Sequence, residues 1–355
     1  MSSVSVVVPC YGYGHFLEAA VSSVLDEQDG VDVRVLIIDD ASPDDSAGVA
    51  RKIAACRPQV EVIVHDVNQG NIATFNEGLL EWADGDYCTL LSADDRATPG
   101  SLGRAADLLD AHPSVGMVYG HALWFQDGTQ LPTARTTVRG WSIWSGQEWL
   151  EQLFRQAENP LTTPEVVVRT SLQHRVGGYD PQLPKAADME LFMKLAAHAQ
   201  VGFIRGVDQA FYRRHDANMS QSVTALMDLR QRRSVFEVVL ERYGERLVDT
   251  DRMSDVVHRR LGHEALWAAG RVYNRGRLRE SELGRRVLGG GGREAEQDVD
   301  ELLAFAVDCW PDAASSRIYR TMTSRGRLGP LELQYLLSQK GQWWLRRRLW
   351  KHRGY

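Results

Sequence analysis

The sequence predicts an α/β protein with a doubly wound, mainly parallel sheet, followed by a mainly α-helical part. Residues 1–120 alternate short apolar runs with segments of helical periodicity, which is the order of elements in a doubly wound sheet. After Ser220 the short apolar runs stop and long helical patterns follow. A chain of 355 residues has room for two such parts.

Four apolar runs in the first part are expected to be buried parallel strands. Each is rich in β-branched residues and ends at polar or turn-forming residues, as strands buried on both faces do. Parallel strands present their carboxyl ends at one edge of the sheet, and ligands bind at that edge. The predicted strands are residues 4–8, 33–38, 60–64 and 87–91.

Helices are expected between these strands and throughout the second part. Apolar residues from Phe16 to Leu25 recur at helical spacing after the first strand. Gly289–Gly292 form a flexible break within the second part. The other predicted helices are residues 44–56, 72–83, 100–111, 224–243, 252–274, 294–309 and 331–349.

Composition and charge exclude several classes of protein. Residues 1–220 carry 16 basic and 29 acidic side chains, so a nucleic acid is not expected as a partner. No apolar stretch approaches the length that spans a bilayer, and the first residues do not resemble a signal peptide. The cysteines form no CxxC pair, which favours a cytoplasmic setting. They are Cys10, Cys56, Cys88 and Cys309.

Two pairs of carboxylates follow two of the predicted strands. Asp39 and Asp40 come after residues 33–38, and Asp94 and Asp95 come after residues 87–91. Adjacent side chains on a strand point to opposite faces, so one acid of a pair can bind a base or ribose while the other meets a hard divalent cation. The alternative is that these acids begin turns or cap helices.

Two nucleotide-binding motifs do not apply. Gly12-Tyr13-Gly14 follows the first strand, but it lacks the third glycine of a dinucleotide fingerprint. No GxxxxGK[ST] phosphate loop is present in the sequence. The sequence therefore does not favour a Rossmann dehydrogenase or a P-loop enzyme.

Several segments, taken in order, resemble the inverting, family 2 glycosyltransferases. That resemblance covers residues 3–221 and implies a GT-A (Rossmann-like) nucleotide-diphospho-sugar transferase fold. The implied catalytic domain is residues 1–222, with a nucleotide-binding half (1–120) and an acceptor-side half (121–222). Residues 223–355 would be a helical C-terminal domain. The similar segments are Val4–Tyr11, Ile38–Ser42, Asn68–Gly78, Gly85–Asp95, Val176–Asp180, Ala187–Phe192 and Tyr212–His215 with Ser220.

The resemblance implies roles for individual residues. Asp188 matches the catalytic base, and its alternative role is to cap the helix that begins there. Asp95, with His215, would hold Mg²⁺ or Mn²⁺. Trp144, Tyr179 and Glu190 fall on the acceptor side, although core packing explains a tryptophan there equally well. Residues expected to bind the nucleotide sugar are Pro9, Tyr11, Asp40, Asn68, Asn76 and Asp94.

The implied activity is transfer of one sugar per encounter. The donor would be a nucleotide-diphosphate sugar, with UDP or dTDP favoured, and the acceptor a glycan, a lipid-linked molecule or a small molecule. No QxxRW motif follows Asp188, which argues against a processive synthase. Ser92 stands where the family often has an acid. The alternative function is a non-catalytic nucleotide-sugar-binding or scaffold protein with the same fold.

The last residues form a basic, tryptophan-rich tail. Residues 342–355 contain three tryptophans, five basic residues and no acid. Such a tail could lie on the anionic inner face of a membrane or pack on its own domain. The helical part could also mediate a homodimer.

Overall fold

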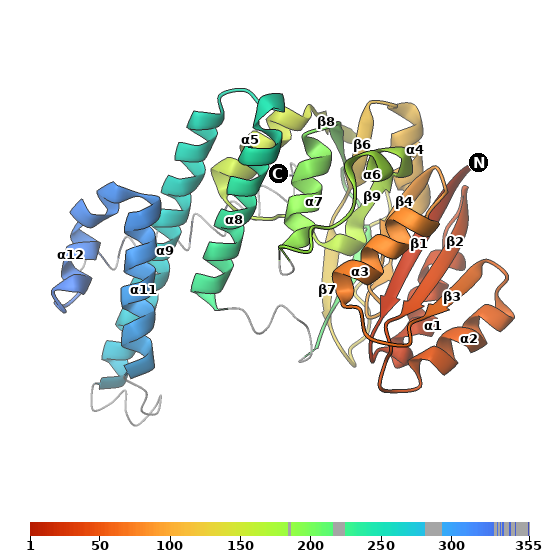
Figure 1. Cartoon of the computed structure of the whole chain (residues 1–355), viewed down its shortest axis with the longest axis horizontal. Helices are drawn as coiled ribbons and strands as arrows, with labels where there is room; N and C mark the ends of the chain where they lie inside the picture. Colours follow the sequence, from red (N-terminus) through yellow and green to blue (C-terminus); the bar gives the residue numbers. More distant parts are fainter. Residues whose placement is uncertain are drawn as a thin grey trace.

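The computed structural model describes residues 1–183, 186–215, 224–280 and 293–329, with single positions after 329 (Glu332, Gln334, Leu336, Gly341, Leu345 and Gly354). Its main sheet has the strand order β3-β2-β1-β4-β9-β6-β10-β8 and lies at one end of the molecule (Figure 1). The strands are β1 (Ser2–Cys10), β2 (Val31–Asp39), β3 (Val60–Val64), β4 (Tyr87–Leu90), β6 (Val115–Tyr119), β8 (Trp141–Trp144), β9 (Val166–Arg169) and β10 (Gln200–Ile204).

Helices cover both faces of this sheet, as predicted for a doubly wound fold. Val4, Val6 and Val8 of β1 pack on one face with α1, α2 and α4, while Val7 faces the opposite core. This alternation follows from the period of two along a strand. The helices on the first face are α1 (Gly14–Leu25), α2 (Ser46–Cys56) and α4 (Ser101–Ala111). Those on the second are α3 (Asn71–Asn76), α5 (Gly146–Gln156), α6 (Thr170–Val176) and α7 (Ala187–Ala196).

The four predicted strands are confirmed as β1 to β4, and they pair in parallel. The rest of the sheet is mixed, because β9 runs antiparallel to both β4 and β6 and β8 runs antiparallel to β10. A second sheet has the order β5-β11-β7. Its strands are β5 (Arg96–Ala97), β7 (Ala122–Gln126) and β11 (Ala210–Arg214).

The predicted helix over 72–83 differs from the observed one. The α-helix ends at Asn76, and Glu77–Trp82 form a π-helical turn. Gly78 lies in this turn directly on β1, where an added Cβ would come within 2.3 Å of Val7 Cγ1. The wider turn and the glycine together let the backbone approach the sheet closely.

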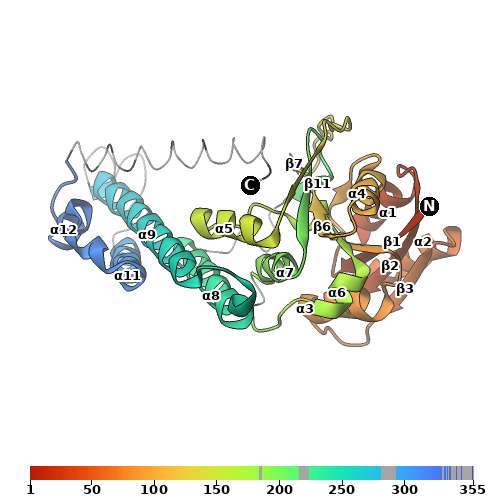
Figure 2. The ribbon, with the colours of Figure 1, turned by 90° about the horizontal axis from the view of Figure 1, so that it is seen from above.

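The second part of the chain is helical, as expected, and extends away from the sheet (Figure 2). Its core is continuous with that of the sheet, because α5 and α7 pack against α8 and α9 through one set of buried apolar side chains. The predicted boundary at 222–223 lies outside the described residues. The elements are α8 (Ala225–Tyr243), α9 (Thr250–Glu280), α11 (Arg293–Cys309) and α12 (Arg317–Thr323), with 3-10 turns at Gly244–Arg246 and Pro311–Ser315.

The penultimate residue of the chain packs on the sheet. The carbonyl oxygen of Gly354 accepts a hydrogen bond from the buried Tyr119 hydroxyl, which also accepts from Trp149 Nε1 at 3.1 Å. This contact agrees with the alternative that the tail packs on its own domain. Most of the tail over 342–355 lies outside the described residues, and so does most of the predicted helix over 331–349. Among the described helices, none has the length and apolarity to cross a bilayer.

Candidate functional site

The predicted carboxylates follow neighbouring strands at the carboxyl edge of the sheet. Cys10 at the end of β1 pairs with Asp39 at the end of β2, and β4 adjoins β1 on its other side. Pro9 is half-buried next to this position, and Tyr11 directly after it has 52% of its surface exposed. The chain then turns through Gly12, whose amide donates to Ser42 Oγ at 2.9 Å.

Both carboxylate oxygens of Asp40 have hydrogen-bond partners within the protein. Its Oδ1 accepts from Gln69 N and lies 2.7 Å from His65 Nδ1, and its Oδ2 accepts from Gly70 N at 2.9 Å. Burial raises the pKa of Asp40, but these hydrogen bonds outweigh it and leave the pKa below its usual value. Asp40 Oδ2 keeps a further acceptor position, so binding of a nucleotide base by Asp40 stays a prediction.

Asp39 has one carboxylate oxygen without a hydrogen-bond partner. Its Oδ2 accepts from Ser42 N at 3.2 Å, whereas its Oδ1 is buried and has no hydrogen-bond partner. Ala41, two residues on, has a positive φ of 55°, which is uncommon for a residue other than glycine. A buried carboxylate oxygen without a donor is costly, so Asp39 is a second candidate, beside Asp40, for contact with a ligand that enters this edge.

Asp94 and Asp95 lie beside β11. Asp95 Oδ1 accepts from Arg213 N at 2.9 Å, and Asp94 Oδ2 lies 3.0 Å from His215 Nε2. Burial and the adjacent charge of Asp94 raise the pKa of Asp95 well above its usual value. Arg213 is itself buried and pairs with Asp127 at 2.6 Å, a partner that sequence reasoning missed.

The donor set at Asp94 and Asp95 fits a divalent cation only in part. Two adjacent buried carboxylates supply the oxygen ligands that Mg²⁺ and Mn²⁺ prefer, and His215 touches one of them. Within the described ranges, however, no group of three acidic, histidine or cysteine side chains is arranged to hold a metal. A metal here would need further ligands, such as the phosphate oxygens that usually complete Mg²⁺ sites.

Asp188 lies in the first turn of α7. The N-cap position is Ala186, so Asp188 is not the N-cap, although its Oδ1 accepts from Met189 N at 2.7 Å. Its Oδ2 accepts from Asn159 Nδ2 at 3.2 Å. The helix N-terminus would lower the pKa of Asp188, but burial outweighs the backbone hydrogen bonds and raises it. A raised pKa strengthens a carboxylate as a base.

The two predicted asparagines hold backbone segments in place. Asn68 Nδ2 donates to the carbonyl oxygen of Asp40 at 3.1 Å. Asn76 makes two hydrogen bonds to the backbone of Tyr179, donating from Nδ2 at 2.9 Å and accepting at Oδ1 at 2.7 Å. Each atom of the Asn76 side chain makes one of these bonds and keeps one further donor or acceptor position, so donor binding by Asn76 stays a prediction.

The predicted acceptor-side residues are mostly packed in the core. Trp144 is half-buried and stacks on Phe203 with ring centroids 6.3 Å apart. Tyr179 is buried against Phe75, and burial followed by the charge of Asp188 raises its pKa. Glu190 is completely buried, 3.4 Å from Lys194, so this structure leaves it no surface to offer to an acceptor.

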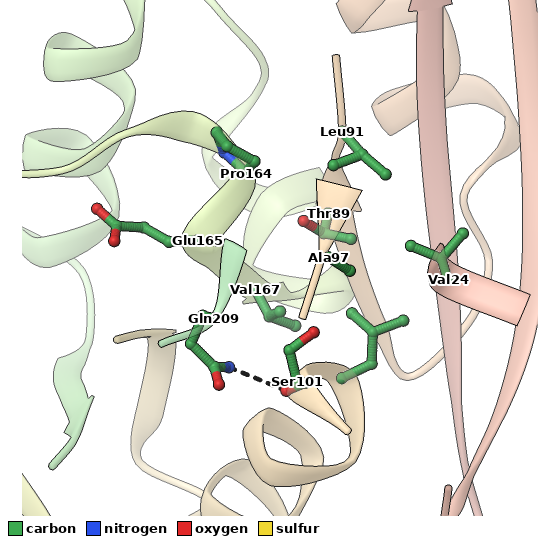
Figure 3. A pocket seen from close by; sticks show the side chains of 10 residues that line it. Val24, Thr89, Leu91, Ala97, Ser101, Pro164, Glu165, Val167 and Gln209 are labelled. Carbon is green, nitrogen blue, oxygen red and sulfur yellow. Dashed lines mark hydrogen bonds between the residues drawn. The ribbon is translucent and has the colours of Figure 1, made fainter. Parts of the chain in front are cut away.

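Two hollows are lined by other residues than the predicted site residues. A cavity of about 10 Å³ beneath β4 and α4 has room for about one water; Figure 3 shows Gln209 bonded to Ser101 at its wall. Burial raises the pKa of Glu165 there to about 8. A groove of about 550 Å³ between α8 and α11 is lined by charged side chains that pair with one another. Neither hollow brings the predicted site residues together.

Solved structures of other proteins have the same fold. Residues 1–349 of TarS of Staphylococcus aureus, solved in complex with UDP, superpose with a TM-score of 0.55 at 16% identity, over 87% of this chain and 81% of that TarS chain. The mannosyltransferase PcManGT of Pyrobaculum calidifontis, solved with GDP-Man and Mn²⁺, gives 0.55 at 17% identity, over 98% and 86%. At this identity the likeness concerns the fold.

Sequence comparison finds a family match in the first part of the chain. The sequence model of glycosyl transferase family 2 matches residues 5–174. An uncharacterized glycosyltransferase of Nostoc is 30% identical over 39% of this chain and 41% of its own length. The putative teichuronic acid biosynthesis glycosyltransferase TuaG of Bacillus subtilis is 29% identical over 36% of this chain and 50% of its own length. The matched regions thus span about half or less of these two relatives.

The fold and these matches define the class of protein. The mixed sheet, with acids at the carboxyl ends of β2 and β4, is that of the GT-A glycosyltransferases. Within that class, residues 5–174 are similar to glycosyl transferase family 2, in agreement with the resemblance of the motifs.

Proposed function

We propose that the chain is a non-processive, inverting glycosyltransferase that moves a sugar from a nucleotide-diphosphate donor to an acceptor hydroxyl. The observation that carries this proposal is Asp188, a carboxylate with a raised pKa in the first turn of α7. Asn159 holds one of its oxygens. A carboxylate that is held in one orientation and has a strengthened basicity is suited to general-base catalysis.

The proposed donor site is the carboxyl edge formed by β1, β2 and β4. Asp39 would accept a hydrogen bond from the base, because its Oδ1 has no protein donor, and Pro9 and Tyr11 would line the base pocket. UDP or dTDP is favoured, and the fold neighbour TarS was solved with UDP. Asp94 would lie at the ribose and diphosphate side.

The proposed reaction is an in-line displacement. The acceptor oxygen attacks the anomeric carbon, its proton passes to Asp188, and the bond from that carbon to the diphosphate breaks with its electron pair leaving on the nucleotide. Mg²⁺ or Mn²⁺ held by Asp95 and Asp94, with His215 nearby, would neutralise charge on the departing diphosphate. PcManGT was solved with Mn²⁺, which supports use of a divalent metal.

Calorimetric titration of UDP, dTDP and GDP, with and without Mn²⁺, tests the donor site. We expect one nucleotide to bind, Mn²⁺ to strengthen binding, and Asp95→Ala to remove that strengthening. The matched control is Asp110→Ala, at the end of α4 beside the amino end of β1, where Asp110 accepts from Ser2 Oγ. If the folded protein bound no nucleotide, the proposal would fail.

The rival function is a scaffold that binds a nucleotide sugar without transferring it. It predicts nucleotide binding but no release of nucleoside diphosphate from any donor. The proposed enzyme predicts slow release even without acceptor, because water can replace the acceptor hydroxyl. Donor hydrolysis therefore distinguishes the two functions.

A further inference from the structure

His65 lies between two carboxylates at the edge of the proposed donor site. Its Nδ1 is 2.7 Å from Asp40 Oδ1, and its Nε2 is 2.7 Å from Glu77 Oε2. The His65 side chain is only 5% exposed. The three residues come from three places: Asp40 follows β2, His65 follows β3, and Glu77 begins the π-helical turn after α3.

With both carboxyl groups ionised, both contacts need hydrogens on the imidazole. An ionised carboxylate can only accept, so each ring nitrogen then donates. Asp40 is ionised, since it also accepts from two backbone amides, Gln69 N and Gly70 N. In a neutral imidazole, one nitrogen lone pair would face a carboxylate oxygen. Burial alone would lower the pKa of His65, but the two carboxylates outweigh it and raise the pKa.

We propose that His65 and Glu77 are positioning residues for the donor: the doubly protonated imidazole ties Asp40 to Glu77 and thereby fixes the segment 68–70 and Asp39 in the arrangement that binds a nucleoside diphosphate. This inference rests on the proposed function. Neither His65 nor Glu77 needs to touch the ligand.

The backbone contacts explain how the bridge acts on Asp39. The amide of His65 donates to the carbonyl oxygen of Asp39 at 2.9 Å, so the same residue holds Asp39 by its main chain and Asp40 by its side chain. Asp40 in turn holds the amides of Gln69 and Gly70. Loss of one imidazole proton removes the hydrogen bond to Asp40 or to Glu77 and so loosens the side-chain half of this arrangement.

The charged groups facing His65 are those of the bridge itself. Glu77 approaches from the π-helical turn, and Asp40 from the end of β2; the buried Asp39 is the next acid along that strand. Asp66, beside His65, is exposed. The electrostatic interactions that shift the pKa of His65 come from Glu77 and Asp40. Replacement of Glu77 by Gln keeps an acceptor for Nε2 and removes one of these two charges.

The test combines a protonation readout with a binding readout on the full chain. Nitrogen-15 spectra of the histidine rings, assigned with His65→Gln, report both nitrogens of His65 between pH 6.5 and 8.5. Calorimetry over the same range gives the Kd of whichever of UDP, dTDP and GDP binds. We expect both nitrogens to be protonated at neutral pH, and Kd to rise at the pH where His65 loses a proton.

Glu77→Gln should shift both midpoints to lower pH together, by about one unit or more for loss of a charge in direct contact. His112→Gln, at the amino end of β6 on the opposite edge, should leave the Kd–pH curve unchanged. The nucleotide's own titration is common to all variants and cancels.

Three results would overturn the inference. One is a ring nitrogen of His65 without a proton at neutral pH. Another is nucleotide binding whose pH curve does not change in Glu77→Gln. The third result needs only the wild-type protein: the pH at which His65 loses a proton would differ from the pH at which Kd rises. Absence of any nucleotide binding would instead overturn the proposed function, and the positioning role with it.

Discussion

At the scale of single residues, the site separates side chains that can meet a ligand from side chains that hold the backbone. Asp39 and Asp40 are adjacent and both buried, yet only Asp40 has both oxygens bound by the protein. Alternation along the strand predicts that two such neighbours point different ways. It does not predict which of them meets the donor, because that depends on His65 and the segment 68–70.

Replacement of Asp39 should mainly affect nucleotide binding, whereas replacement of Asp40 should mainly affect stability. Asp39→Asn is expected to weaken nucleotide binding by about 10- to 100-fold, the value of a hydrogen bond to a charged group, with little change in Tm. Asp40→Asn is expected to lower the free energy of unfolding by about 1–3 kcal/mol, because it disrupts hydrogen bonds to a buried carboxylate. Calorimetry and thermal unfolding measure the two effects. Equal loss of binding with no loss of stability in Asp40→Asn would restore Asp40 as the ligand contact.

The pH dependence of turnover should report Asp188. A general base acts in its ionised form, and burial raises the pKa of this carboxyl. The rate is therefore expected to fall as pH decreases, with a midpoint above the usual value for an aspartate near 3.9. A kcat–pH profile under saturating donor measures this midpoint. Asn159→Ala, which removes the donor to Asp188 Oδ2, should shift the midpoint upward.

At the scale of elements, the sequence predicts the strands and helices whose residue pattern is local and repetitive. The four β-branched runs are strands β1 to β4 because each is apolar and bounded by turns. The antiparallel strands β8 and β9 were not predicted, and their direction is set by the tertiary fold. The early end of α3 also reflects packing, since Gly78 meets Val7 of β1.

One motif joins two distant elements. Asn76 at the end of α3 holds the backbone of Tyr179, and an added Cβ on Gly178 would lie 2.0 Å from Asn76 Oδ1. The two segments Asn76–Gly78 and Val176–Asp180, which are far apart in the sequence, are thus in direct contact in the fold. Prediction assigned Asn76 to the donor because a motif gives order along the chain and not the partner of a side chain.

Gly178→Ala should therefore disrupt this clamp. We expect a loss of about 1–3 kcal/mol in the free energy of unfolding, typical of overpacking in a closely packed site, measured by urea unfolding. Gly128→Ala provides a contrast: Gly128 has open space around it, although its φ of +74° makes that substitution somewhat strained. A Gly178→Ala variant as stable as wild type would contradict the clamp.

At the scale of the whole molecule, the end of the chain returns to the sheet. Gly354 has a φ of +86°, and an added Cβ would come within 2.5 Å of Phe203 and 2.9 Å of Trp144. The sequence predicts a helical second part from its periodicity, but nothing local indicates that residue 354 meets Tyr119. Contacts between positions 235 residues apart are set by the fold as a whole.

Gly354→Val should release this contact. We expect a Tm lower by a few degrees, as about 1 kcal/mol shifts the Tm of a large domain by about 2–4 °C, and increased proteolysis of the C-terminal end. Scanning calorimetry and limited proteolysis measure these effects. An unchanged Tm together with an unchanged digestion pattern would contradict docking of the C-terminal end on the sheet.

The most direct test of the central claim is release of nucleoside diphosphate from a panel of UDP-, dTDP- and GDP-sugars by the wild-type protein and by Asp188→Asn. We expect the wild type to turn over one class of donor. Asp188→Asn should bind that donor with unchanged Kd and turn it over about 10²- to 10⁴-fold more slowly, the usual contribution of a general base. Turnover by Asp188→Asn at the wild-type rate would contradict the role of Asp188 as the general base.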